Sequence, residues 1–456
     1  MCKQVEREQF SSRSEMKFRR RHFLQWGLTQ VTAAAVLANQ AKASDSSELP
    51  VRQGLSMMQG ATDETTTQFS VLHLRSQNLK FYIKNKQNTQ IFPFQMKVVQ
   101  SANHPYQLTK LIVQGLNPKE TYVIQVVDQS QSQLIDTREF KTLNVDREDL
   151  AIAMCTCMDD EKHDPMMWQN MMRQRPDLLI FLGDCAYANR GANKGMADAA
   201  HLWKMFCQAR LTLEIYYTPV LVPIVATWDD HDFGMNNGDA QEFPFVLESQ
   251  QNFLNFFAQE PGVCRNMFVG PGVSSAWKFG SNLFFLLDNR SFRERNESTG
   301  RYAHWGREQE EWMMSLIRQH TGPTFICSGS VFFLEMMMVE SLSKCHPGQF
   351  RGFLSELRSV ASKVVFVSGD VHFSEVSRIE PEILGYTTYE LTSSSIHSVV
   401  LPGILSLISN PRRVVATSQR NYILFRPSAN GYGCSLNATS FGKNGQVLFQ
   451  KVLDVK

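Results

Sequence analysis

The sequence lacks long apolar runs, a strong excess of one charge, internal repeats and low-complexity tracts. No segment beyond the N-terminus approaches the ~18 continuous apolar residues of a membrane helix, so we expect no membrane span in the mature protein. The 46 lysines and arginines nearly balance 44 acidic residues, giving a net charge of +2. This balance gives no reason to expect a nucleic-acid-binding surface. With 43% hydrophobic and 20% charged residues, the chain can form a sizeable core.

The N-terminus carries a pattern typical of export signals. Arg20 and Arg21 are followed by His-Phe-Leu, then by a weakly apolar stretch at 28–38 and an Ala-Lys-Ala tripeptide at 41–43. A twin arginine before x-Phe-Leu favours a Tat signal, with a Sec signal or a basic amphipathic helix as alternatives. Cleavage after the tripeptide would remove residues 1–43. We therefore expect recognition by the Tat export machinery and a periplasmic or secreted protein.

Cysteine is scarce and scattered along the chain. Of nine cysteines, Cys2 lies in the predicted signal, which leaves eight. An even number in an exported chain suggests disulfides. However, a large core needs no such staples, and a Tat substrate folds in a reducing cytosol. Each cysteine is therefore considered separately.

Two regions with different patterns follow the predicted signal. Residues 55–145 contain short alternating runs separated by turn residues, such as "TQFSVLHL", "KFYIK", "LTKLIVQGL", "TYVIQVVD" and "REFKTL". This rhythm predicts an N-terminal β-sandwich domain of the fibronectin or immunoglobulin type.

The second region, residues 148–456, predicts a catalytic α/β domain. Near-continuous apolar strands indicate burial on both faces, so we expect helices packed on each side of a sheet. The expected architecture is an α/β sandwich of two facing sheets or one large mixed sheet. Residues 397–418 fit either a buried helix or a surface loop. Helices are expected near 164–174, 196–209, 245–259 and 306–320.

Potential metal ligands follow four of the predicted strands. Ligands of α/β sheets gather beyond the carboxyl ends of strands, so these side chains are expected to meet. Asp, His, Tyr and Cys are all metal ligands, whereas a single aspartate there would be explained as a helix cap. The residues are Cys155 or Cys157, Asp184 with Tyr187, Asp229 or Asp230 with His231, and Asp370 with His372.

Several of these motifs resemble one known family. "GDCAY", "TWDDHD", "LLDNRSFR" and "SGDVHFSE", in this order, resemble the alkaline phosphatase D (PhoD-like) metallophosphatases, over about residues 60 to 450. The resemblance implies a metallophosphatase-like fold. It also implies an enzyme that hydrolyses phosphate esters with a metal-bound hydroxide. It implies these metal ligands: Cys157, Asp184, Tyr187, Asp230, Asp370 and His372.

The resemblance also implies individual roles and two metals. Asp184 would bridge the metals, and His231 would donate a proton to the leaving alkoxide. Thiolate, phenolate and imidazole suit Fe³⁺, whereas the aspartates suit Ca²⁺. One departure concerns the family's V-x-x-H element, for which "FICSGSVFF" offers only Cys327, Ser328 and Ser330. The second metal would then bind mostly oxygen.

Other residues near the motifs have competing interpretations. Asp229 is expected to brace the turn, and residues 232–239 to form a polar loop. Arg290 could bind phosphate with two parallel hydrogen bonds, or form a salt bridge with Asp288 or Glu294. His397 could border the pocket.

The sequence therefore predicts an exported metal-dependent phosphoesterase. One alternative is a protein that keeps this fold and binds phosphate ligands without catalysis. Another is a phospholipase-D-like diesterase.

Overall fold

A computed structural model describes residues 54–296, 298–335 and 339–456. The predicted signal, residues 1–43, lies outside the described residues. Those that are described belong to one structural unit, residues 51–456. None of the helices in this part of the chain combines the length and the apolar character needed to cross a bilayer.

The first strands form two antiparallel sheets that enclose a core of their own. One sheet has the order β1 (Ser56–Thr62), β2 (Thr67–Leu74), β6 (Tyr106–Val113) and β5 (Phe94–Gln100). The other has the order β4 (Ile91–Phe92), β3 (Leu79–Asn85), β7 (Thr121–Asp128) and β8 (Gln133–Lys141). Phe140 contacts Phe69 edge-on at 4.9 Å and stacks on Tyr122 at 5.4 Å, so aromatic rings from both sheets fill the space between them. The predicted N-terminal β-sandwich is confirmed.

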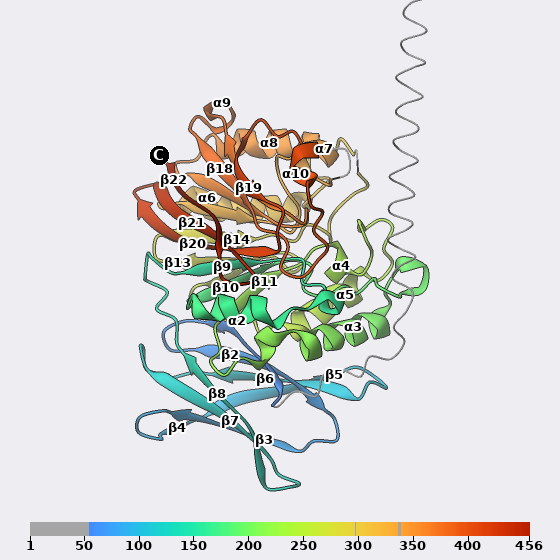
Figure 1. The fold of residues 1–456 in the computed structure, drawn as a ribbon, viewed down its shortest axis with the longest axis vertical. Helices are drawn as coiled ribbons and strands as arrows, with labels where there is room; N and C mark the ends of the chain where they lie inside the picture. The colour runs from blue at the N-terminus through green and yellow to red at the C-terminus, as the bar shows by residue number, and fades with distance from the viewer. Residues whose placement is uncertain (1–53, 297, 336–338) are drawn as a thin grey trace, which may run out of the picture. The chain divides into compact units, whose positions relative to one another are not determined.

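The remaining strands form two larger mixed sheets (Figure 1). The six-stranded sheet has the order β11 (Ile224–Thr227), β10 (Leu178–Leu182), β9 (Ile152–Cys155), β20 (Asn421–Asn430), β21 (Gly433–Gly442) and β22 (Val447–Val455). The eight-stranded sheet has the order β12 (Met267–Val269), β13 (Ser275–Phe279), β14 (Asn282–Leu286), β15 (Thr324–Cys327), β16 (Val364–Ser368), β18 (Thr388–Thr392), β17 (Ser374–Ile379) and β19 (Arg413–Thr417). Of the two arrangements expected for this region, the structure has the two sheets.

Alternation along the strands decides what each sheet face contacts. In β9, Ile152 and Met154 pack with Phe284 and Phe325 of the eight-stranded sheet, in one core between the sheets. Ala153 and its neighbour Cys155 belong to a second core on the other face, because successive strand residues point to opposite sides. Both faces of the strand are therefore buried, as the apolar runs predicted.

Helices cover the outer faces. The second core includes buried residues of α2 (Pro165–Arg173), α3 (Ala199–Thr212) and α5 (Val246–Phe256). Helices α6 (Gly306–Gln319) and α8 (Pro347–Leu357) contribute to the core of the eight-stranded sheet. The short helices are α4 (Asp230–Phe233), α7 (Leu342–Cys345), α9 (Pro381–Leu384) and α10 (Ile404–Leu407). Helices α2 and α3 begin at capping residues, since the side chains of Asp164 and Asp198 accept hydrogen bonds from backbone N–H groups of their first turns.

Two segments differ from the sequence-based expectation. Helix α8 was not predicted, because Gly348 and Gly352 weaken the helical pattern within "HPGQFRGFLSEL". Residues 397–418 are neither a buried helix nor a plain loop. They contain the short helix α10, none of whose residues is fully buried, and the sheet strand β19.

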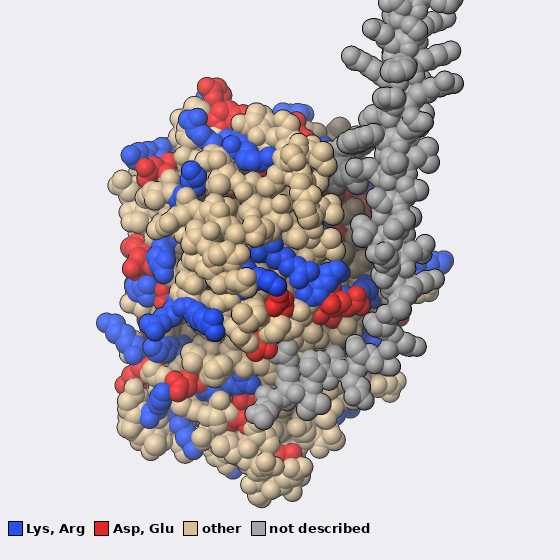
Figure 2. All heavy atoms as spheres, viewed as in Figure 1, with Lys and Arg blue, Asp and Glu red and all other residues tan. Residues whose placement is uncertain are grey.

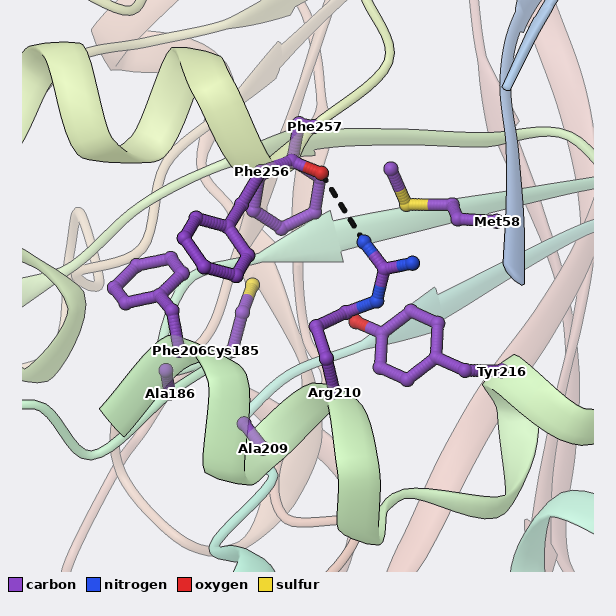
Figure 3. A pocket seen from close by; sticks show the side chains of 9 residues that line it. All are labelled: Met58, Cys185, Ala186, Phe206, Ala209, Arg210, Tyr216, Phe256 and Phe257. Atoms are coloured by element: carbon purple, nitrogen blue, oxygen red, sulfur yellow. Dashed lines mark hydrogen bonds between the residues drawn. The ribbon is translucent and has the colours of Figure 1, made fainter. Parts of the chain in front are cut away.

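A buried arginine of α3 joins the sandwich to the rest of the unit. The Arg210 guanidinium donates to the backbone oxygens of Ser56 at 3.1 Å, Ser70 at 2.8 Å and Phe256 at 3.2 Å. It lies over the ring of Tyr216, 4.4 Å from the centroid, and burial lowers its pKa. Arg210, Tyr216 and Phe256 line a cavity of about 10 Å³, room for about one water molecule (Figure 3). No ion pair forms with Arg210 among the described residues. Hydrogen bonds to uncharged acceptors, such as the hydroxyl and carbonyl oxygens of Ser70, therefore stabilise its buried charge.

We predict that Arg210→Ala lowers the free energy of unfolding by about 2–4 kcal/mol, because it leaves buried carbonyls unpaired and opens a cavity. Urea denaturation would measure the loss. Arg307→Ala is the matched control, since the Arg307–Glu311 pair is mostly exposed and should contribute little. Equal midpoints for the two variants would contradict the role given to Arg210.

Candidate metal centre

Predicted ligands from both large sheets meet where parallel strands end. Cys157 follows β9, Asp184 follows β10, Asp230 follows β11 and His372 follows β16. The ligand atoms of Cys157, Asp184 and His372 lie within 4.8 Å of one another, and those of Asp184, Asp230 and His231 form a second group of this kind. Asp184 belongs to both groups. It therefore occupies the position that a residue bridging two metals requires.

Four of the candidate ligands have a strained backbone conformation. Cys157, Asp184, Asp370 and His372 have φ angles of 55°, 53°, 70° and 56°, in the left-handed region that L-residues seldom adopt. Each such residue costs on the order of 1–2 kcal/mol, and strain of this kind clusters at functional sites. Gly183 allows the close approach that places Asp184, since a Cβ there would lie 2.6 Å from that of Asp229.

Of the two candidate cysteines, only Cys157 faces this centre. The Cys155 thiol points to the helix side of the sheet, where it lies 3.8 Å from the Met171 sulfur. The Cys157 sulfur lies 3.2 Å from the hydroxyl of Ser394, and burial raises its pKa. An uncharged thiol is the expected form without a cation. A bound metal would favour the thiolate.

Asp229 braces the turn, and Arg290 is its main partner. The Arg290 Nε and Nη2 atoms lie 2.7 and 2.5 Å from Asp229 Oδ1. The same oxygen accepts from Asn289 at 2.8 Å and Ser330 at 3.3 Å. Asp229 therefore links β11 of one sheet to the ends of β14 and β15 of the other.

The position of Arg290 differs from both interpretations of the sequence. Its side chain is only 1% exposed, and besides Asp229 it contacts the Gly238 carbonyl at 3.1 Å and Glu340 at 3.2 Å. A guanidinium enclosed in this way supports the site instead of reaching a substrate phosphate. The expected salt bridge exists, but its partners are Asp229 and Glu340 rather than Asp288 or Glu294.

Asp230 is held as a carboxylate. Each of its oxygens accepts one backbone N–H, from His231 at 2.8 Å and from Asn237 at 2.7 Å. Burial alone would raise its pKa, but the positive charges of His231 and Arg290 and the two amides lower it to about 2. A buried carboxylate that is ionised at neutral pH is suited to binding a cation.

His231 is oriented by a side chain that the sequence analysis did not single out. Asn189 Oδ1 lies 2.7 Å from His231 Nδ1, and an amide oxygen only accepts, so the proton resides on Nδ1. The ring stacks on that of Tyr187, with centroids 4.1 Å apart. Nε2 is then free to bind a metal or to exchange a proton with a substrate.

His372 and Asp370 differ in how closely they join the centre. The Ser398 hydroxyl lies 3.0 Å from His372 Nε2, and burial together with the charge of His231 lowers the His372 pKa to about 4. Asp370 belongs to neither close group of ligand atoms found among the described residues. Its pKa is raised by burial and by the charges of Asp229 and Asp230. The Asp370 carboxyl therefore lies near these two aspartates but outside both groups of ligand atoms.

The donor set fits bound cations. Asp184 is 1% exposed, and burial and the charges of Asp230 and Asp229 raise its pKa well above the ordinary range. Asp184 Oδ1 and the Tyr187 hydroxyl have no hydrogen-bond partner within the described chain, and burial together with the charge of Asp184 raises the pKa of the Tyr187 phenol well above its usual range. Buried oxygens without donors and carboxylates that repel one another are both stabilised by a metal ion.

Three further residues acquire roles only in three dimensions. Asp232, expected in a polar loop, is fully buried and accepts from the amides of Ala186 and Asp229 at 2.8 and 3.1 Å. Burial raises its pKa to about 8. His397 lies behind the site, where its ring contacts Trp168, 5.5 Å between centroids. The third is Asn189, and its only sequence signal is its place in the loop that follows Asp184.

Comparison with known proteins defines the class. The pattern of the PhoD-like phosphatases matches residues 150–435, which covers the eight-stranded sheet, the strands β9, β10, β11 and β20 of the six-stranded sheet, and the strand-end ligands. The chain belongs to the PhoD-like phosphatase family. It is therefore a phosphatase-type hydrolase by family.

The other comparisons add little. No curated protein matches the chain. Among solved structures, an IgNAR antibody domain C1 is 16% identical over 22% of this chain and 100% of its own length, with a TM-score of 0.16. That likeness is too weak to carry an argument.

We predict that Asn189→Leu lowers kcat for a chromogenic phosphate ester about 10- to 100-fold, because His231 loses the acceptor that fixes its proton. KM should change less, since Asn189 is placed to act through His231. Asn193→Leu, at an exposed position of the same loop, is the control and should keep full activity. An unchanged kcat in the Asn189 variant would refute this positioning role.

Proposed function

We propose that the protein is an exported, metal-dependent phosphoesterase that hydrolyses phosphate esters at the strand-end centre. The observation that carries this proposal is the shared position of Asp184 in two groups of buried ligand atoms. Family membership supports the reaction class, and the donor chemistry supports two metal ions. When bound, such ions supply Lewis acidity and lower the pKa of a water molecule.

The residues divide between the two metal positions. Cys157, Asp184 and His372, with the Tyr187 phenol nearby, offer sulfur, oxygen and nitrogen, a set that suits Fe³⁺. Asp184 and Asp230 offer mostly oxygen, which suits Ca²⁺. Asp370 is assigned to the same position, because its carboxyl lies close enough to Asp230 for the two charges to interact. No histidine of a V-x-x-H element is needed for this assignment.

His231 is assigned the transfer of a proton to the leaving oxygen. Its Nδ1 proton is held by Asn189, and its side chain, unlike Asp184 and Asp230, is partly exposed. Nε2 is then the atom that carries and releases the proton, work that typically contributes about 10²–10⁴ in rate. Arg290 supports the reaction indirectly, because its ion pair with Asp229 keeps the turn in place.

We predict that Asp184→Asn abolishes hydrolysis of chromogenic phosphate mono- and diesters and lowers the bound metal measured by elemental analysis. The amide keeps the shape of the side chain but removes the charge on which both metal positions depend. Wild-type protein should also show a visible charge-transfer band from phenolate or thiolate to iron, and the variant should lack it. Full activity in Asp184→Asn would end the proposal, and a colourless, fully active wild type would remove iron from it.

Export through the Tat machinery is proposed from the twin arginine and the Ala-Lys-Ala tripeptide. The free, buried state of the eight described cysteines is compatible with folding in a reducing cytosol before export. Replacing both arginines, Arg20→Lys with Arg21→Lys, should leave the full-length protein in the cytoplasm in a cell-fractionation experiment. Normal export of the double variant would contradict Tat export. Loss of wild-type export when Sec alone is blocked would contradict it as well.

A further inference from the structure

An uncharged segment lies exposed beside the metal centre. Residues 399–411, called the apolar segment here, read VVLPGILSLISNP and contain no charged side chain. Val399, Leu401 and Leu407 are 42%, 49% and 65% exposed, and Val414 just beyond is 41% exposed. In Figure 2, the surface around α10 is mostly neutral, with charged side chains toward its edges. Single exposed apolar residues are common, but several of them within one uncharged segment are typical of an interaction site.

The exposure of this segment is built into the fold. Arg413 Nη1 donates to the carbonyls of Leu405 at 3.0 Å and Ile408 at 3.1 Å, while its Nε pairs with the buried Glu375 at 2.7 Å. Ile408 is buried in a small apolar cluster with Phe373. The backbone is thus anchored from beneath, and Leu401 and Leu407 remain on the outside.

A cavity of mixed charge lies next to the apolar segment. Its volume is about 730 Å³, within the ~300–1,000 Å³ typical of ligand sites. Among the residues that line it are Arg378, Arg412, Glu335, Glu380 and Phe333. Arg412 pairs with Glu380, whereas Arg378 forms no ion pair within the described chain. Cationic and anionic side chains side by side match a zwitterionic headgroup better than a purely anionic one.

The apolar segment directly follows a residue that contacts one of the candidate metal ligands. Ser398, whose hydroxyl contacts His372, directly precedes Val399. Val371, between the ligand candidates Asp370 and His372, packs on the same small cluster as Ile408. A surface that covers the apolar segment would therefore lie at the edge of the metal centre.

We propose that the apolar segment docks on a zwitterionic phospholipid surface, with Leu401 and Leu407 inserted among the acyl chains and the adjacent cavity facing the headgroups. Four exposed side chains offer far less area than the ~800 Å² per partner of a stable protein interface, so a second copy fits less well than lipid. A lipid surface requires no shape complementarity, and insertion follows the pattern of interfacial apolar segments. This inference concerns binding alone and is independent of hydrolysis.

The test is cosedimentation of the full chain with phosphatidylcholine vesicles, without any substrate assay. Leu401→Asp and Leu407→Asp should each weaken vesicle binding about tenfold or more, since each removes apolar burial and adds a charge that resists insertion. Leu247→Asp is the matched control, because Leu247 is 74% exposed on α5, and it should bind like wild type. All three variants should keep wild-type hydrolysis of a small soluble ester.

Three outcomes would overturn the proposal. Wild-type protein that does not bind phosphatidylcholine, or that binds only vesicles with anionic lipid, would exclude apolar docking on a zwitterionic surface. Equal binding by all variants would assign vesicle binding to another part of the chain. Dissociation of a wild-type oligomer by the Leu401 and Leu407 variants, without vesicle binding, would show that a second copy covers the segment.

Discussion

The ion pair between Asp229 and Arg290 is the interaction on which the geometry of the centre depends. Asp229 Oδ1 receives donors from the loops after β14 and β15, while its own backbone continues from β11. One carboxylate oxygen thus fixes loops from two sheets against each other. Both partners are 1% exposed, so their pairing offsets a desolvation cost that neither charge could sustain alone.

This pairing gives adjacent aspartates opposite tasks. Asp229 faces Arg290, so Asp230, the next residue, is turned toward Asp184 and His231. The amides of His231 and Asn237 keep Asp230 ionised, while Asp232 closes the turn through the amide of Asp229. A short acidic stretch therefore combines one brace, one ligand candidate and one buried link, although its side chains are chemically alike.

Much of this arrangement could be predicted from the sequence, because burial on both faces and strand-end ligands leave strong patterns. The β-sandwich and four of the helices followed from such patterns, whereas the choice of Asp230 over Asp229 as the ligand candidate came from the family resemblance. Arg290 could not be placed, since nothing local in "LLDNRSFR" reveals that its partners Asp229 and Glu340 come from distant loops. Asn189 was missed because a single asparagine in a loop has no periodic signal. Helix α8 was missed because its glycines oppose the helical pattern that tertiary packing overrides.

The left-handed backbone at Cys157, Asp184, Asp370 and His372 has a consequence for how the centre can diversify. Aspartate, asparagine and histidine tolerate this conformation better than most residues, and glycine tolerates it freely, whereas β-branched side chains do not. Few residue types can therefore replace these ligands without strain, whichever metal is bound. An exchange of aspartate for asparagine or histidine preserves the local chain path, so changes in metal preference are expected to arise through that small set. Threonine also offers oxygen, but its β-branched side chain is strained in this conformation, so it is a costlier replacement at these positions than asparagine or histidine.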